Sequence, residues 1–255
     1  SEGALGFDVN HPLTATQAAS ARRAGFQFCL RYVPRLDLSV EPLGHGDITY
    51  EEADDILSAG LSIALVQHVS QQGWSASADL GKHFGTNAAI YAAACGFPAI
   101  HGEEPRTNLF LDLEEVNLSS GADAIMAFCN EWHEAVWGGG FEPGIYVGSK
   151  NGLNAQQLFQ GTPFRHYWHA ASQADPPQPR SNDRGYQLFQ PLSLSQQQMD
   201  QLEGVDLQNA KAGNCFECDL VFADGQRILG VDVDVAKADA RGGRLNLLSR
   251  IQRAS

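Results

Sequence analysis

Basic side chains are few in this sequence. Its 255 residues include 17 Lys and Arg against 30 Asp and Glu, which gives a formal net charge of −13. Binding to nucleic acid requires a positively charged surface, so this balance argues against a nucleic-acid partner. The excess of negative charge also disfavours attraction to anionic surfaces, and a neutral or weakly charged polymer is the more favourable partner.

Long apolar runs are also missing. No stretch approaches the roughly 20 apolar residues that cross a membrane, so we expect no membrane span. The first residues lack the basic and apolar regions of a signal peptide, although a mature chain whose signal had been removed would begin in the same way. With 43% hydrophobic and 18% charged residues, the composition predicts a folded globular protein, and the length fits one domain over residues 1–255.

Cysteine is scarce, with five in the chain. Cys29, Cys95 and Cys129 fall in strand-like or helix-like runs, where buried thiols are ordinary. Cys215 and Cys218 form a single Cys-x-x-Cys pair without the further ligands of a zinc site, so a local disulfide or two free thiols is favoured. No Gly-x-Gly-x-x-Gly follows the first strand-like segment, which argues against a bound dinucleotide. We therefore expect neither a metal nor another cofactor.

Strand-like and helix-like segments alternate through the first half of the chain. The expected strands span 6–10, 26–33, 62–69, 109–114 and 145–147, and the expected helices span 14–24, 49–59, 79–95, 119–137 and 153–159. This alternation predicts βαβ units and a parallel sheet. Five such units in a chain of this length favour a closed TIM-type (β/α) barrel over an open sheet.

The second half is predicted to contain few helices. Two strands without a helix between them, a hairpin around Asp224-Gly225, at most one short helix and a closing amphipathic helix are expected. These segments are, in that order, 165–170 and 185–190, 216–222 and 227–235, 195–209, and the run containing Leu245, Leu248 and Ile251. The predicted fold is therefore α/β, a modified TIM-type barrel with few helices in its second half.

Carboxylates stand where several of these strands end. Asp112 and Glu114 close an apolar run, and residues i and i+2 of a strand share a face, roughly 6–7 Å apart. Cleavage of a glycosidic bond needs two such groups, one to donate a proton and one to stabilise positive charge. Asp8 ends the first strand, and Asp232 and Asp234 share a face of the last. Because active sites of barrels lie at the carboxyl ends of the strands, we expect these side chains to converge.

Other polar and aromatic side chains fall at the same predicted end of the barrel. Aromatic faces stack on sugar rings, so this set is predicted to bind a glycan. Its members are Arg31, Tyr32, Gln67, Trp74, Tyr146, Trp168, Gln190 and Asp234. His68, His166 and His169 are interpreted as structural, and Glu115 as a solvated residue or a helix cap. Long segments after the second, third and sixth strands either wall a groove or are surface insertions.

Short motifs in these strands resemble, in order, those of family 25 glycoside hydrolases, which are lysozymes that cut the β-1,4 bond of peptidoglycan. The motifs are Gly6-Phe-Asp-Val, Leu111-Asp-Leu-Glu, Gly144-Ile-Tyr-Val, Tyr167-Trp-His-Ala, Gln187-Leu-Phe-Gln and Val231-Asp-Val-Asp. A closer similarity covers nearly the whole chain and includes Leu30-Arg-Tyr and Asp232-Val-Asp-Val-Ala-Lys. It is to a glycoside-hydrolase-like domain, formerly a domain of unknown function, that is related to those lysozymes.

The resemblance implies a role for each carboxylate. Glu114 would be the general acid, and Asp112 would stabilise an oxocarbenium or oxazolinium charge or orient an N-acetyl group. Asp8 and Asp232 would complete a catalytic acidic cluster. Asp234 stands where the lysozymes often have a neutral residue, which leaves the choice between Asp232 and Asp234 open. The resemblance also implies a sugar subsite lined by Tyr146, Trp168 and Gln190.

The sequence thus predicts a glycosidase that acts on a peptidoglycan-like cell-wall glycan or another polysaccharide. Such a substrate would place the protein outside the cell or in its envelope. Two alternatives stay open. One is a catalytically silent barrel that binds a glycan, and the other is a hydrolase that uses Asp8, Asp112, Glu114 and Asp232 around a divalent cation.

Overall fold

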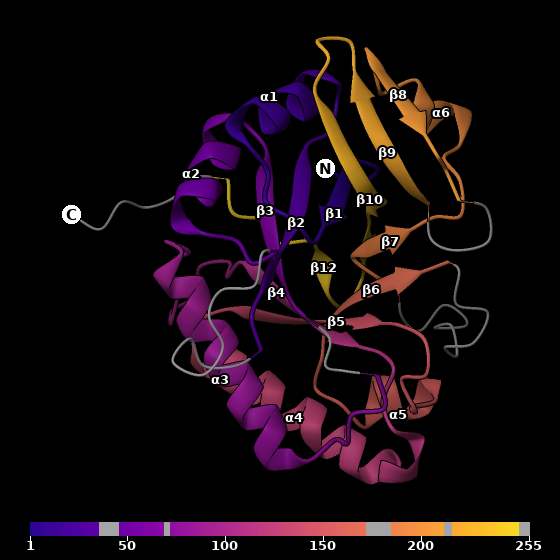
Figure 1. Ribbon diagram of the computed structural model, residues 1–255. Helices are drawn as coiled ribbons and strands as arrows, with labels where there is room; N and C mark the ends of the chain where they lie inside the picture. The colour runs from indigo at the N-terminus through magenta and orange to yellow at the C-terminus, as the bar shows by residue number, and fades with distance from the viewer. Residues whose placement is uncertain (36–45, 69–71, 172–184, 212–215, 250–255) are drawn as a thin grey trace.

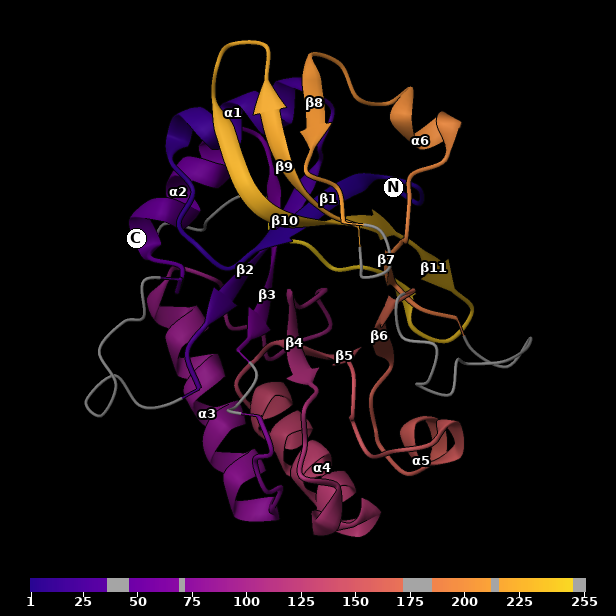
Figure 2. The same cartoon turned by 45° about the vertical axis from the view of Figure 1, so that its right-hand side comes forward.

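Eight strands close a barrel at the centre of the molecule (Figures 1 and 2). The structure is a computed structural model that describes residues 1–35, 46–68, 72–171, 185–211 and 216–249. Strands β1 to β7 follow one another around the ring, and β10 lies between β7 and β1. The barrel strands are β1 (Leu5–Val9), β2 (Phe28–Val33), β3 (Ser62–Gln67), β4 (Asn108–Leu113), β5 (Glu142–Val147), β6 (His166–Ala170), β7 (Leu188–Gln190) and β10 (Arg227–Ala236).

The last barrel strand runs against the others. Neighbours from β1 to β7 are parallel, whereas β10 is antiparallel to both β1 and β7. A hairpin with β9 (Glu217–Phe222) leads into β10, so no crossover helix is needed. Gly225 turns this hairpin at a φ of 85°, where a side chain would be strained. The predicted modified TIM-type barrel is confirmed.

Helices cover the outside of the regular half of the barrel (Figure 1). Thr14 and Thr49 cap the first two, as the sequence predicts, each accepting a hydrogen bond from a backbone N–H of the first turn. The helices are α1 (Ala15–Arg23), α2 (Tyr50–Ser58), α3 (Ala78–Ala94), the 3-10 turn η1 (Leu118–Ser120), α4 (Ala122–Gly138), α5 (Ala155–Gln160) and the short α6 (Gln196–Met199). None of them, within the described ranges, has the length and apolar character of a membrane-spanning helix.

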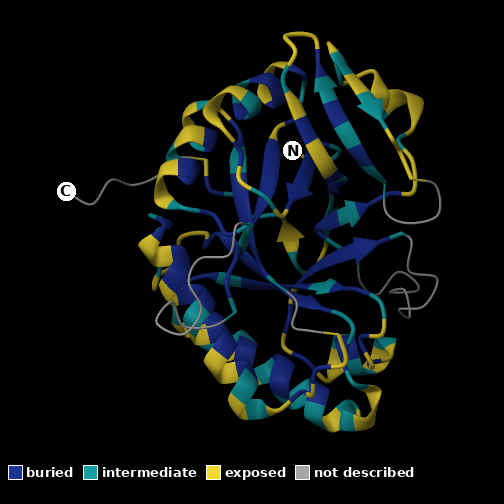
Figure 3. Ribbon diagram, viewed as in Figure 1, coloured by how far each residue is buried: buried dark blue, intermediate teal, exposed yellow. Residues whose placement is uncertain are grey.

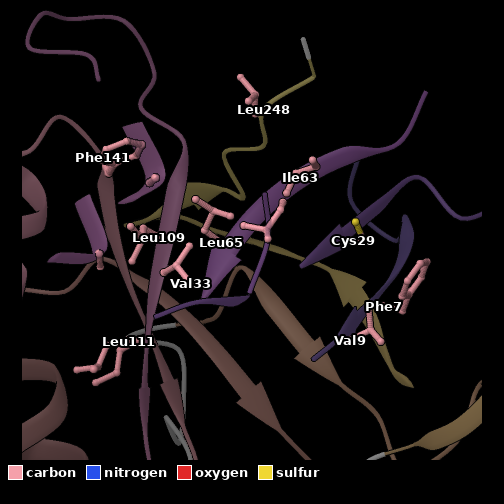
Figure 4. Close-up of a cluster of buried hydrophobic side chains, with 14 of the residues drawn as sticks. Phe7, Val9, Cys29, Val33, Ile63, Leu65, Leu109, Leu111, Phe141 and Leu248 are labelled. Carbon is pink, nitrogen blue, oxygen red and sulfur yellow. The ribbon is translucent and has the colours of Figure 1, made fainter. Parts of the chain in front are cut away.

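Side chains of the barrel strands alternate between two apolar clusters. Figure 3 shows that the strands are buried, while the helices carry their exposed residues on the outer side. The cluster outside the ring includes Phe7, Val9, Cys29, Val33, Ile63, Leu65, Leu109 and Leu111 (Figure 4). The cluster inside it includes Phe28, Leu30, Ala64, Val66, Phe110, Trp168 and Leu188. Burial on both faces explains why these strands are nearly continuous apolar runs in the sequence.

Two glycines let α3 and α4 pack closely. A Cβ at Gly81 would lie 2.1 Å from the carbonyl oxygen of Phe128, and one at Gly85 would lie 2.6 Å from that of Trp132. Nε1 of Trp132, on α4, donates a hydrogen bond to Oε1 of Gln67 on β3 over 2.7 Å. Nε2 of Gln67 in turn donates to the carbonyl oxygen of Phe84 on α3 over 2.8 Å, so β3 is bonded to both helices.

Two predicted segments have a different structure. Residues 205–208, expected to be helical or irregular, form β8 (Val205–Gln208), which pairs with the free edge of β9. The closing helix is not formed in the described part of 243–249, where Leu248 and Ile63 instead exchange two backbone hydrogen bonds of 2.8 Å. That pairing requires an extended chain. Ile251 lies outside the described residues, and a small hairpin of β11 (Ala238–Asp239) and β12 (Gly243–Arg244) precedes this segment.

Candidate active site

The four carboxylates predicted to be catalytic come together at the mouth of the barrel. Asp8 of β1 is in register with Asp232 of β10, and Asp112 is in register with Tyr146 on the neighbouring β5. Glu114 lies just past the end of β4, and its pKa is raised by the charge of Asp232, which comes from the far end of the sequence. Closure of the barrel therefore brings together residues from the beginning, the middle and the end of the chain.

Asp8 is the buried centre of this cluster. Only 5% of the residue is exposed. The hydroxyl of Tyr32 donates a hydrogen bond to its Oδ1 over 3.0 Å, and the Nε2 of Gln190 donates one to its Oδ2 over 2.7 Å. Burial, followed by the charge of Asp232, raises the pKa of Asp8 well above its ordinary value. The predicted residues Tyr32 and Gln190 thus bind the carboxylate itself.

Asp234 lies one layer deeper than Asp232, because β10 runs antiparallel to β1 and Asp234 is in register with Gly6. It is fully buried, and Nε1 of Trp168 donates a hydrogen bond to its Oδ1 over 2.9 Å. Burial and then the charges of Asp8 and Asp232 raise the pKa of Asp234 well above its ordinary value. Asp232 is therefore the nearer of the two aspartates to the mouth.

Trp168 forms part of the floor under the carboxylates. Only 2% of it is exposed, and its ring packs edge-on against Phe110 and Tyr146, with centroid distances of 5.8 and 4.7 Å. The expectation that a sugar stacks on this indole is corrected, because neither face is open. Tyr32 and Tyr146 are the half-buried aromatics of the inner face, and the ring of His68 stacks on Tyr32 at 4.5 Å.

Asp232 titrates in a range that suits proton transfer. Burial, followed by the charge of Glu217, raises its pKa to about 6, and Lys211 acts in the opposite direction. Glu217 lies directly across from it in the β9–β10 register and accepts a hydrogen bond of 2.6 Å from Nζ of Lys211. Glu217 was missed in the sequence, although pairing the predicted hairpin outward from Asp224-Gly225 identifies it as a neighbour of Asp232.

Glu114 is half-buried and closely supported. Burial raises its pKa, and the charges of Glu115 and Asp232 add to that, while a hydrogen bond from the backbone N–H of Ser149 opposes them. The carbonyl oxygen of Glu114 accepts a hydrogen bond from Nε1 of Trp74 over 2.9 Å. A Cβ at Gly148 would lie 2.5 Å from the Oε2 of Glu114, so a glycine there leaves the space that this carboxyl occupies.

Three residues predicted to bind substrate point away from the site, and that expectation is corrected. Arg31 extends outward to α2, where its Nε donates a hydrogen bond to Glu52 over 2.7 Å. Gln67 also faces outward and bonds to Trp132 and to the carbonyl oxygens at 34 and 84. Trp74 is buried against Phe128, with a ring distance of 4.7 Å, and supports the backbone of Glu114 instead of offering a face to a sugar.

The described cysteines are buried, and the described residues contain no cluster that would hold a metal ion. Cys29, Cys95 and Cys218 are buried free thiols whose pKa burial raises to about 12, and Cys129 is a buried free thiol as well. Cys215 lies outside the described residues, as do residues 36–45, 70–71 and 172–184 of the three long segments expected to wall a groove. Within the described residues, no three His, Cys, Asp or Glu side chains are arranged to hold a metal ion.

Comparison with protein families identifies the chain. A family model described as "Rv2525c-like, glycoside hydrolase-like domain" matches residues 19–236. The chain belongs to this glycoside hydrolase-like family. The match includes Asp112, Glu114 and Asp232, whereas Asp8 lies ahead of its first matched residue. A search of curated proteins finds no match.

Solved structures share the fold of this glycoside hydrolase-like protein. The Tat-secreted protein Rv2525c of Mycobacterium tuberculosis, in complex with L-tartrate, is 17% identical, with 95% of this chain and 99% of that chain covered and a TM-score of 0.57. An uncharacterized B. stearothermophilus protein is 18% identical over 94% and 97% of the two chains, with a TM-score of 0.56. The bacterial lysozyme from Streptomyces coelicolor is 14% identical over 94% of both chains, with a TM-score of 0.50.

Proposed function

We propose that this protein is a glycoside hydrolase in which Glu114 is the general acid. The observation that carries the proposal is the position of Glu114, a half-buried carboxyl at the mouth of a barrel whose pKa is raised by burial and by the charges of Glu115 and Asp232. A general acid must still hold its proton at the working pH, and burial beside like charges is the usual way to achieve this.

In the proposed reaction, Glu114 donates its proton to the glycosidic oxygen as the bond from that oxygen to C1 breaks. The bonding electrons stay with the leaving oxygen, and positive charge develops at C1. Asp112 stabilises that charge, or orients a neighbouring N-acetyl group whose carbonyl oxygen takes it up as an oxazolinium. Water then adds at C1, and its proton leaves to the cluster, which returns to its starting state.

The other residues of the inner face have supporting roles in this proposal. Asp8 and Asp232 complete the acidic cluster around the reacting sugar, and Asp234 lies beneath them. Tyr32 and Tyr146 line the sugar subsite as the half-buried aromatics closest to the carboxylates. The proposed substrate is a cell-wall glycan such as peptidoglycan, or another polysaccharide. Family membership and the fold shared with the Streptomyces coelicolor lysozyme support this choice. We also propose that the protein acts outside the cytoplasm, as the Tat-secreted Rv2525c does.

The deciding experiment is a panel of glycans that includes peptidoglycan, assayed for new reducing ends with the wild type and with Glu114→Gln. We expect the substitution to lower kcat by about 10²–10⁴-fold, because the amide cannot donate the proton, and to leave binding nearly unchanged. Glu131→Gln, an exposed position on α4, is the matched control and should keep full activity.

Each alternative has its own outcome in the same experiment. If the wild type binds a glycan but cleaves none across the panel, the protein is a binding barrel and the proposed reaction is wrong. Loss of cleavage on addition of a chelator would instead indicate the metal-dependent hydrolase.

A further inference from the structure

We propose that Glu115 is a positioning residue that acts on the carboxyl of Glu114 both through its contact with Ser149 and through its charge. The reaction in which this matters is the proposed one, but the contacts that carry the inference are independent of it. Glu115 follows the candidate acid directly in the sequence, where it looks like an ordinary solvated carboxylate.

The backbone of Glu115 is held in an uncommon conformation. Its φ is 52°, in the left-handed region that costs a residue with a side chain roughly 1 kcal/mol or more. Two hydrogen bonds to neighbouring segments maintain it. The N–H of Glu115 donates to the carbonyl oxygen of Ser149 over 2.8 Å, and the N–H of Gly73 donates to the carbonyl oxygen of Glu115 over 2.7 Å.

The carboxylate of Glu115 collects three donors from two segments. Its Oε1 accepts from the hydroxyl of Ser149 over 2.8 Å, and its Oε2 accepts from Nζ of Lys150 over 2.9 Å and from Nε2 of Gln72 over 3.1 Å. The side chain is 26% exposed, so it is well enough covered to hold one position. Glu115 therefore joins the segment after β5 to the segment that leads into α3.

Ser149 transmits this position to Glu114. Its hydroxyl is bound by the carboxylate of Glu115, while its own backbone N–H donates to the carboxyl of Glu114. Gly148 lies next to it, with no room for a Cβ beside Oε2 of Glu114. The acid is thus seated against a backbone segment whose place Glu115 sets.

Glu115 also contributes charge. It is the largest charged influence on Glu114, and it raises the pKa of that carboxyl. The titratable groups around Glu114 come from its own segment, from the β5 segment and from β10, and they are Asp112, Glu115, Tyr146, Lys150 and Asp232. Lys150 forms an ion pair of 2.9 Å with Glu115.

Three variants of one residue separate the possible roles. Glu115→Gln keeps an acceptor for the Ser149 hydroxyl but removes the charge, so the alkaline limb of the pH–rate profile should move to lower pH with kcat otherwise near wild type. Glu115→Ala removes the contacts too, and kcat should fall on the order of tenfold to a hundredfold while KM changes little. Glu115→Gly relieves the left-handed backbone without restoring the carboxylate. It should match Ala, and a Gly variant with wild-type kcat overturns the proposal.

A second readout does not depend on turnover. The ¹³C signal of the Glu114 carboxyl, assigned by its loss in Glu114→Gln, is titrated in the wild type and in Glu115→Gln. The midpoint should move to lower pH in the variant, and an unchanged midpoint overturns the inference. Arg23→Met, which breaks the exposed ion pair with Asp224, is the control and should leave the midpoint in place. If the wild type cleaves no glycan, the proposed function fails, and this titration still decides the role of Glu115.

Discussion

The buried carboxyl of Asp234 lowers the stability of the folded protein at neutral pH. It is fully buried beneath Asp8 and Asp232, whose charges, after burial, raise its pKa well above the ordinary value. The folded state therefore binds a proton that the unfolded chain has already released at moderate pH. Asp234 contributes fully to stability at a pH below the pKa that its carboxyl has in the unfolded chain. This contribution is lost as the pH rises toward the raised pKa of the folded state.

Replacing this residue with its neutral isostere should stabilise the protein at neutral pH. Asp234→Asn keeps an oxygen for the indole N–H of Trp168 and removes the carboxyl that must take up a proton on folding at neutral pH. We expect a gain on the order of 1 kcal/mol at pH 7–8, or about 2–4 °C in Tm, and a much smaller gain near pH 4. Calorimetry at the two pH values measures it. An equal gain at both would show that the ionisation of Asp234 is not the cause.

At the scale of elements, β2 illustrates why a neighbour in the sequence need not be a neighbour in the site. Arg31 and Tyr32 are adjacent, so they face opposite sides of the barrel wall, and the inner side belongs to Tyr32. Arg31 instead forms an ion pair with Glu52 of α2, with side-chain exposures of 0% and 6%. Glu52 also accepts a hydrogen bond of 2.8 Å from the N–H of Leu13.

Arg31→Met should therefore destabilise the fold without changing the site. It leaves the carboxylate of Glu52 buried without its cation, a loss of about 3–5 kcal/mol, and Tm should fall on the order of 10 °C. Thermal unfolding measures the change in Tm, and KM for the glycan of the proposed reaction should stay at the wild-type value. The double variant Arg31→Met/Glu52→Gln should recover part of the loss. A raised KM with normal Tm would restore the substrate-binding role predicted from the sequence.

The same alternation explains what could be predicted from the sequence. The i, i+2 rule predicts Asp112 and Glu114 on one face, because that relation is local to a strand, although β4 ends at Leu113 and Glu114 follows it. The sequence could not predict whether Arg31 and Gln67 point into or out of the barrel, since both sides of a barrel wall are buried and apolar. The role of Glu115 depends on a left-handed backbone and on partners more than thirty residues away, as in its bond from Lys150, and no local pattern marks either.

At the scale of the whole molecule, the net charge of −13 gives the protein a negative electrostatic field, and some of its carboxylates gather at the mouth of the barrel. Such a field repels anionic polymers and is screened by salt, with a Debye length of about 10 Å at 0.1 M. We expect association with a carboxylated polysaccharide to speed up as salt increases, while association with its neutral counterpart hardly changes. Stopped-flow measurements at several ionic strengths test this. Faster binding of the anionic polymer at low salt would contradict it.

The pairing of β1 with β10 has a consequence for folding. These strands carry Asp8 and Asp232 and come from the two ends of the described chain, so their contacts have nearly the largest sequence separation possible. Contacts of this kind form slowly, after local helices and neighbouring strands. The acidic cluster is therefore assembled only by the step that seals the ring. The cluster is therefore not assembled in a nascent chain that is still on the ribosome, nor in a chain that is cut between these strands and separated. The carboxylates begin to repel one another only when folding is nearly complete.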